Sequence, residues 1–217
     1  MRTYIDDSLV NSDYYCDRVA ATATGQYSTQ VEGSFIQKAL MLHLAKSAVI
    51  FDAGGEPAIP VILLDSKAKH FPIKEASIDC ILCIEADSLV LLEWFFSECN
   101  RILKGNGIII FTLLNRFSYK GFYKKFVLRE DFSKHLWKKL HYATSFRRIK
   151  SRLRNASFSI TRAKGFYWLP VSRESNSKLV PYRAFIEKLL HVDLLPSLSP
   201  RIIIRARKIE QYATYNN

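Results

Sequence analysis

The fold of this 217-residue chain is decided by one short stretch, which reads Ala48-Val49-Ile50-Phe51-Asp52-Ala53-Gly54-Gly55. An apolar run that ends at an acid and two glycines is typical of a buried strand followed by a turn. Further strand-sized apolar runs lie at 61–64, 78–85 and 108–114. Because the run at 78–85 is apolar on both faces, it indicates a parallel sheet between two helical layers.

Segments with helical spacing of apolar residues separate these strands. One such segment is 33–46, and another is 89–103, where the following Gly105 and Gly107 predict a left-handed helix stop. The remaining predicted elements are a helix at 145–155, a strand at 158–164, a helix at 181–191 and a strand at 201–208. This alternation predicts an α/β fold with a doubly wound, mostly parallel, Rossmann-like sheet whose ligands gather at the carboxyl ends of the strands.

Length and composition indicate one folded domain spanning 1–217, with a helical lead-in at 1–32. Apolar residues make up 48% and charged residues 24% of the chain, which excludes disorder. No apolar run reaches the length of about eighteen residues that a membrane span needs, and the first residues lack the apolar region of a signal peptide. We expect a cytoplasmic protein, with peripheral membrane attachment as an alternative.

Positive charge is concentrated in one part of the chain. The net charge is +12, and the segment 116–164 alone holds fifteen Lys/Arg and two acids. The first part of this segment, 116–142, interrupts the strand–helix alternation and is predicted to be a basic helical insertion with interleaved aromatic residues. Three roles stay open for the segment: a lid over the active site, a contact with an anionic membrane, or a contact with RNA phosphates.

Four stretches, in order, resemble motifs of the small type 11 kind of class I S-adenosylmethionine-dependent methyltransferases. The stretches are Tyr15-Cys16-Asp17-Arg18-Val19-Ala20, Val49-Ile50-Phe51-Asp52-Ala53-Gly54-Gly55, His70-Phe71-Pro72-Ile73-Lys74-Glu75-Ala76-Ser77-Ile78-Asp79 and Glu98-Cys99-Asn100-Arg101-Ile102-Leu103-Lys104-Gly105-Asn106-Gly107. The resemblance extends over residues 14–208. It implies a methyltransferase-like sheet and S-adenosylmethionine as the cofactor.

The resemblance also implies where the cofactor binds. Asp52, Gly54 and Gly55 follow the first strand, where a glycine turn admits the methionine moiety. Asp65 is the expected ribose carboxylate, and Glu85 ends the fourth strand on the ligand side. The stretch 71–73 is expected near the adenine, and Asn115 at the end of the fifth strand is a further candidate on the substrate side. No general base is identifiable in the sequence, and the resemblance implies that catalysis depends mostly on holding the acceptor in line with a methyl group already activated on a sulfonium.

The chain departs from the family pattern after the first strand. Glu56 and Ala58 replace the second and third motif glycines, and only seven residues, 53–59, precede the next apolar run. A crossover between adjacent parallel strands needs about a dozen residues, so about one strand–helix unit is expected to be missing. Either 61–64 is the second strand and Asp65 binds ribose, which we favour, or it is the third strand and no ribose acid exists.

Cys80 and Cys83 form a C-x-x-C pair on a predicted strand. Residues three apart on a strand point to opposite faces and cannot bind one metal ion together, so no metal site is expected. The predicted function is methyl transfer to a small-molecule or lipid-linked acceptor, anionic or saccharide in type. The alternative is an inactive methyltransferase-fold protein that binds RNA, a membrane or a partner protein through 116–164.

Overall fold

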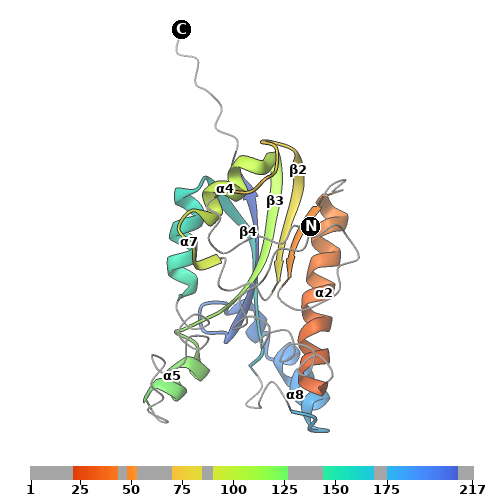
Figure 1. The fold of residues 1–217 in the computed structure, drawn as a ribbon. Coiled ribbons are helices and arrows are strands. Elements are labelled where there is room, and N and C mark those ends of the chain that lie inside the picture. The colour runs from red at the N-terminus through yellow and green to blue at the C-terminus, as the bar shows by residue number, and fades with distance from the viewer. Residues whose placement is uncertain are drawn as a thin grey trace, which may run out of the picture.

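The computed structural model describes residues 22–43, 48–52, 70–84, 90–126, 144–168 and 175–209 (Figure 1). The elements in chain order are α2 (Ala23–His43), β1 (Ala48–Asp52), β2 (Ile78–Ile84), α4 (Phe95–Ile102), β3 (Leu103–Leu114), α5 (Tyr119–Phe126), α7 (Phe146–Asn155), β4 (Phe158–Phe166), α8 (Val180–Leu189), the 3-10 helix η1 (Val192–Leu194) and β5 (Arg201–Lys208). Each strand predicted within these ranges is present, and the prediction for β5 matches its observed bounds.

The described strands form one sheet in the order β1-β2-β3-β5-β4. The β1–β2 and β2–β3 pairings are parallel, whereas β5 is antiparallel to both of its neighbours. Four of the five described strands therefore run in one direction, which agrees with the prediction of a mostly parallel sheet, and β5 runs in the opposite direction, which makes the sheet mixed. Periodicity in the sequence shows that 201–208 is a strand but not which way it runs. The predicted loss of a strand–helix unit concerns 53–69, which lies outside the described residues.

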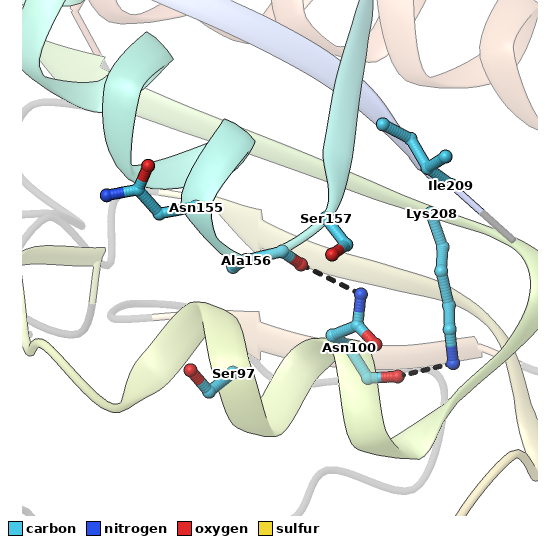
Figure 2. A pocket seen from close by; sticks show the side chains of 7 residues that line it. All are labelled: Ser97, Asn100, Asn155, Ala156, Ser157, Lys208 and Ile209. Atoms are coloured by element: carbon cyan, nitrogen blue, oxygen red, sulfur yellow. Dashed lines mark hydrogen bonds between the residues drawn. The ribbon is translucent and has the colours of Figure 1, made fainter. Parts of the chain in front are cut away.

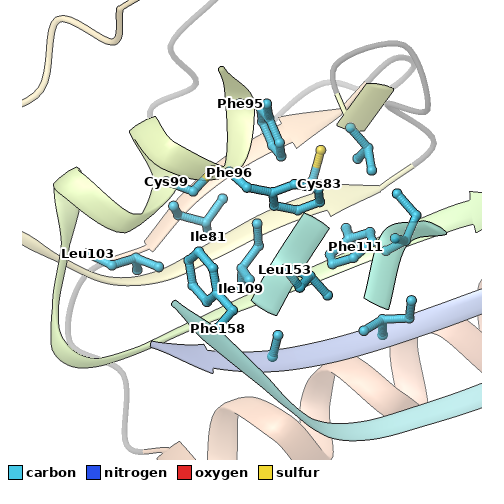
Figure 3. Close-up of a cluster of buried hydrophobic side chains, with 14 of the residues drawn as sticks. Ile81, Cys83, Phe95, Phe96, Cys99, Leu103, Ile109, Phe111, Leu153 and Phe158 are labelled. Carbon is cyan, nitrogen blue, oxygen red and sulfur yellow. The ribbon is translucent and has the colours of Figure 1, made fainter. Parts of the chain in front are cut away.

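Helices cover both faces of the sheet. Helix α2 packs on one face through Phe35 and Ala39, and α4 and α7 pack on the other (Figure 1). Alternate residues of β3 pack against opposite helical layers. Ile109 and Phe111 lie in the larger cluster of buried apolar residues, with α4 and α7 (Figure 3), and Ile110 lies in the smaller cluster, under α2. The prediction of strands buried on both faces is thus confirmed.

The end of α4 differs from the sequence prediction. No glycine in the described ranges has a positive φ, and Leu103 after α4 is already extended, at φ −74° and ψ 138°. The chain passes directly from α4 into β3, so the predicted left-handed stop at Gly105 and Gly107 is wrong. Gly107 is instead a close-packing position, because a Cβ there would lie 2.8 Å from Leu103 Cδ2.

Helix α7 has the predicted amphipathic pattern. Ser145 caps it by accepting a hydrogen bond from Arg148 N at 3.3 Å, and Ile149 and Leu153 are buried. The other side of the helix carries basic residues, of which Arg147, Arg148, Lys150 and Arg154 are exposed. Arg152 is the exception, since its guanidinium donates to the carbonyls of Val90 and Leu92 and so fastens α7 to the start of the α4 region.

The predicted boundary between the helical lead-in and the first helix shifts. Helix α2 begins at Ala23, ten residues before the predicted start at 33, and so crosses the predicted end of the lead-in at residue 32. Helix α5 confirms a helix in the basic insertion, of which 127–142 lies outside the described residues. Within the described ranges, no helix combines the length and hydropathy needed to cross a bilayer.

Candidate cofactor site at the carboxyl edge of the sheet

The carboxyl ends of β1 and β2 lie side by side. The two parallel strands pair from Ala48 with Cys80 through to Asp52 with Ile84, so Asp52 ends β1 directly beside the last residue of β2. Ligands of open α/β sheets bind outside the carboxyl ends of the strands. The backbone thus brings Asp52 to the edge where the cofactor was predicted, although its side chain lies outside the described residues.

The other predicted cofactor residues are Gly54, Gly55, Asp65 and Glu85, and all four lie outside the described ranges. The same holds for the run at 61–64, so both alternatives for that strand stay predictions. In sequence, Glu85 follows Ile84 directly and Gly54 stands two residues after Asp52.

Asn115, at the end of β3, has a structural role. It is fully buried, and its side-chain nitrogen donates to the carbonyl oxygens of Ser197 at 2.7 Å and Ser199 at 3.2 Å. Its side-chain oxygen accepts from Phe117 N at 3.2 Å. Because backbone groups occupy both ends of the amide, Asn115 joins the end of β3 to the loop before β5 rather than facing a substrate.

An aromatic cluster lies beyond the ends of β3 and β4, and the sequence analysis missed it. The ring of Tyr119 stacks on Trp168 with 5.7 Å between centroids, and its hydroxyl donates to the Trp168 carbonyl. Lys120 Nζ lies 3.6 Å from the centroid of the Tyr167 ring. Tyr167 has a φ of 69°, which is rare for an aromatic residue and is held by such surroundings. The available signal was the aromatic run 166–168 just after the predicted strand.

Trp168 adds an unusual polar group to this cluster. Its Nε1 is buried and has no hydrogen-bond partner within the part of the chain that the structure describes. A buried indole N–H normally finds an acceptor. The cluster therefore offers aromatic faces and a donor at the carboxyl edge, next to the basic segment.

The stretch 70–73 lies at the opposite edge, because it leads into the amino end of β2. The Phe71 ring is fully buried between Trp94 and Phe95, at centroid distances of 5.4 and 6.1 Å. A ring enclosed in this way leaves no face for adenine. The predicted packing of Phe71 against the cofactor is therefore wrong, since this side chain is an anchor of the core.

Glu98 and Arg101 hold this stretch in place. Glu98 Oε2 accepts from Phe71 N at 3.0 Å, and Arg101 donates to the carbonyls of Phe71 and Ile73, each at 3.0 Å. Burial alone would raise the pKa of the Glu98 carboxyl, but hydrogen bonds from Arg101 and Phe71 N outweigh it and lower the pKa. His70 Nδ1 lies 3.1 Å from the same carboxylate and adds a structural contact.

A pocket of about 310 Å³ also lies at the amino edge (Figure 2). Its lining residues are Ser97, Asn100, Asn155, Ala156, Ser157, Lys208 and Ile209. Lys208 Nζ donates to the carbonyls of Asn100 and Leu103, at 2.7 and 2.8 Å, and the Asn100 amide donates to Ala156 O at 2.8 Å. These contacts join the ends of α4 and α7 at the amino edge of the sheet. The pocket therefore lies away from the carboxyl edge, where the cofactor was predicted.

The two cysteines of the C-x-x-C pair point to opposite faces of β2, as predicted. Cys83 lies in the larger core cluster and Cys80 in the smaller one. Burial raises the pKa of the Cys80 thiol to about 12. Neither sulfur can share a ligand with the other, and Cys80 is not a thiolate near neutral pH.

Comparison with known proteins agrees with this geometry. Residues 19–111, which contain α2, β1, β2, α4 and most of β3, match the methyltransferase-domain family by sequence. This segment is a methyltransferase domain. The family uses S-adenosylmethionine as its methyl donor. No curated protein shows significant sequence similarity to the chain.

One solved structure has a similar fold over most of the chain. A protein of Bacillus halodurans C-125 assigned as a methyltransferase superposes with a TM-score of 0.50 at 15% identity, over 81% of this chain and 99% of that one. A SAM-dependent methyltransferase of Thermotoga maritima gives a TM-score of 0.48 at 17% identity, over 83% of this chain and 98% of that one. At such identities the likeness concerns the fold alone.

Proposed function

We propose that the protein transfers a methyl group from S-adenosylmethionine to an anionic, lipid-linked or saccharide-type acceptor. The observation that carries the proposal is the pairing of Asp52 with Ile84, which makes the ends of β1 and β2 neighbours within the segment that matches the methyltransferase family. The polar residues that flank these ends in sequence are those that the family resemblance gives to the cofactor.

In this proposal, Asp52, Gly54 and Gly55 would hold the methionine moiety, Asp65 would accept the ribose hydroxyls, and Glu85 would complete the site. The bound cofactor supplies a methyl group already activated on a sulfonium. The protein's own contribution is then positional, because it must exclude water and hold the acceptor atom in line with the methyl group. This requirement explains how the chain can act without an identified general base.

The acceptor would bind between the cofactor and the basic segment. Tyr119 and Lys120, at the start of that segment, stand at the carboxyl edge together with Trp168. The buried Nε1 of Trp168 supplies a donor, and the surrounding cations favour a negatively charged acceptor. The segment would thus act as a lid whose inner side selects the acceptor.

Calorimetric titration with S-adenosylhomocysteine tests the proposal. The wild-type protein should bind, and Asp65→Ala should weaken binding by about tenfold or more, because a carboxylate hydrogen-bonded to ribose is lost. Glu75→Ala is the matched control, since Glu75 is an exposed acid at the amino edge. Equal affinities for the two variants would refute the role given to Asp65.

The alternative function is that of an inactive methyltransferase-fold protein that binds RNA, a membrane or a partner protein. The observation in its favour is the exposed basic side of α7, formed by Arg147, Arg148, Lys150 and Arg154. Binding through this side should be sensitive to salt and should fall when Arg147 and Arg148 are changed to Glu. Such binding, together with no detectable binding of S-adenosylhomocysteine at millimolar concentration, would favour the alternative.

A further inference from the structure

Helix α8 turns its apolar side outward. Only Val180 and Glu187 of its described side chains are buried. The exposed large apolar residues on and around it are 49 to 71% exposed, namely Leu179, Tyr182, Phe185, Ile186, Leu189 and Leu190. A surface helix of a globular protein normally buries its apolar stripe against the core, so α8 has the inverse arrangement.

The one acid of α8 is turned away from this exposed side. Glu187 Oε2 accepts a hydrogen bond from the Tyr27 hydroxyl of α2 at 2.8 Å, and the residue is 8% exposed. The exposed charged side chains described around the helix are Lys178 and Lys188. The outward side of α8 therefore combines apolar and cationic groups.

The loop after α8 continues the apolar surface. Leu194, Leu195 and Leu198 are 71, 48 and 52% exposed. The loop is not loosely attached, because Asn115 donates to the carbonyls of Ser197 and Ser199. The structure therefore displays these leucines on a fixed backbone. We call the nine residues the apolar end face: Leu179, Tyr182, Phe185, Ile186, Leu189, Leu190, Leu194, Leu195 and Leu198.

Helix α5 lies at the same end of the molecule as α8 (Figure 1). Phe117, Phe122 and Tyr123 are 67, 59 and 52% exposed there, and Arg116 is exposed beside them. Exposed cations described at this end of the molecule are Arg116, Lys178 and Lys188. One end of the protein thus presents two sets of exposed apolar side chains accompanied by positive charge.

We propose that the apolar end face docks on the surface of an anionic phospholipid bilayer. Exposed apolar patches of this extent mark interaction sites, and helices with an apolar side flanked by Lys and Arg bind in the plane of the interface. Charge complementarity selects the bilayer, because anionic headgroups attract the cations beside the patch. A second copy of the chain would instead bring one net charge of +12 against another.

Vesicle sedimentation tests the docking with a readout that does not depend on methyl transfer. The full chain should sediment with vesicles of phosphatidylcholine mixed with phosphatidylglycerol and much less with phosphatidylcholine alone. Replacing Phe185 and Leu189 together by Ser should lower partition onto the mixed vesicles by about tenfold or more. Ile209→Ser is the matched control, since Ile209 is 46% exposed but lies at the opposite edge.

A second measurement follows insertion directly. Phe185→Trp should gain fluorescence that lipids brominated in their acyl chains quench, beyond the quenching of the wild-type tryptophans. The docking proposal is overturned if the wild type does not sediment with anionic vesicles, or if the Phe185→Ser, Leu189→Ser double variant sediments as much as the wild type does. It is also overturned if the brominated lipids cause no additional quenching of Phe185→Trp. A dimer in solution that the double variant dissociates would also overturn it, because the face would then bind a second copy.

Discussion

Arg101 Nη2 lies 3.0 Å from Glu98 Oε2, and the same oxygen accepts a hydrogen bond from Phe71 N. These residues belong to two separate stretches that resemble methyltransferase motifs, 70–79 and 98–107. The contact explains why both motifs matter to the fold. Glu98 and Arg101 on α4 hold the loop that precedes β2 in place. Correct placement of β2 in turn sets its carboxyl end beside Asp52.

Glu98→Gln should destabilise the fold by about 1–3 kcal/mol. The carboxylate side chain is 12% exposed, and its loss weakens charge-assisted hydrogen bonds to Arg101 and Phe71 N. Urea unfolding followed by circular dichroism measures the change. Glu93→Gln is the control, since Glu93 is exposed and its change should stay within about 0.5 kcal/mol. Equal effects of the two substitutions would contradict the role of Glu98.

The advantage of wild type over Glu98→Gln should depend on pH. The folded-state pKa of Glu98 is lowered, so its charged form stabilises the fold fully above its unfolded pKa of about 4.3. This contribution is lost as the pH falls below that value and through the folded pKa. Unfolding curves at a series of acidic pH values should show the difference shrinking below about pH 4. A difference that persists undiminished there is not compatible with the lowered pKa.

Gly165→Ala should destabilise the protein, whereas Gly33→Ala should stabilise it. A Cβ at residue 165 would lie 1.7 Å from Ser199 Oγ and 2.5 Å from Ser199 Cβ, so the loop before β5 must move. We expect a cost of about 1–3 kcal/mol. At Gly33, inside α2, no atom lies within 4 Å of the added Cβ, and alanine should gain about 0.5–1 kcal/mol. Thermal melting of both variants checks the opposite signs.

Replacing only one residue of the ion pair between Glu32 and Arg201 should strongly lower the free energy of unfolding. Arg201 Nε lies 3.2 Å from Glu32 Oε1, and the side chains are 3 and 9% exposed for Arg201 and Glu32 respectively. Arg201→Met alone should cost about 3–5 kcal/mol, because the buried carboxylate of Glu32 loses its ion pair with this guanidinium. The double variant with Glu32→Leu should recover part of that loss, which a double-mutant cycle by urea unfolding measures. A double variant as unstable as the sum of the single changes would contradict this coupling.

The sequence predicted the central strands of the described sheet because these strands are apolar on both faces. Ile108–Phe111 and 201–208 are strands for this reason, and the stripe of Ile149 and Leu153 predicted the inner side of α7. Strand direction was not predictable in the same way. The position of β5 between β3 and β4 depends on long-range pairing, such as Leu114 with Arg201, that leaves no local pattern.

The sequence predicted the location of the candidate site but not the roles of the side chains around it. Chain order and strand ends predicted the carboxyl edge at Asp52, and the β1–β2 register agrees. Side-chain roles could not be predicted, since they depend on which backbone groups come near. Asn115 follows a strand just as a ligand residue would, yet loop carbonyls occupy its amide. The family resemblance suggested a cofactor contact for Phe71, but Trp94 and Phe95 enclose its ring.

The central claim, that the cofactor binds at the carboxyl ends of β1 and β2, is tested most directly by amide chemical shifts in a titration with S-adenosylhomocysteine. The backbone signals of Asp52 and Ile84, which pair across the two strands, should move in a saturable way. The signals of Asn100, Ser157 and Lys208, around the amino-edge pocket, should stay in place. Shifts confined to the amino-edge pocket, or none at millimolar ligand, would contradict the claim.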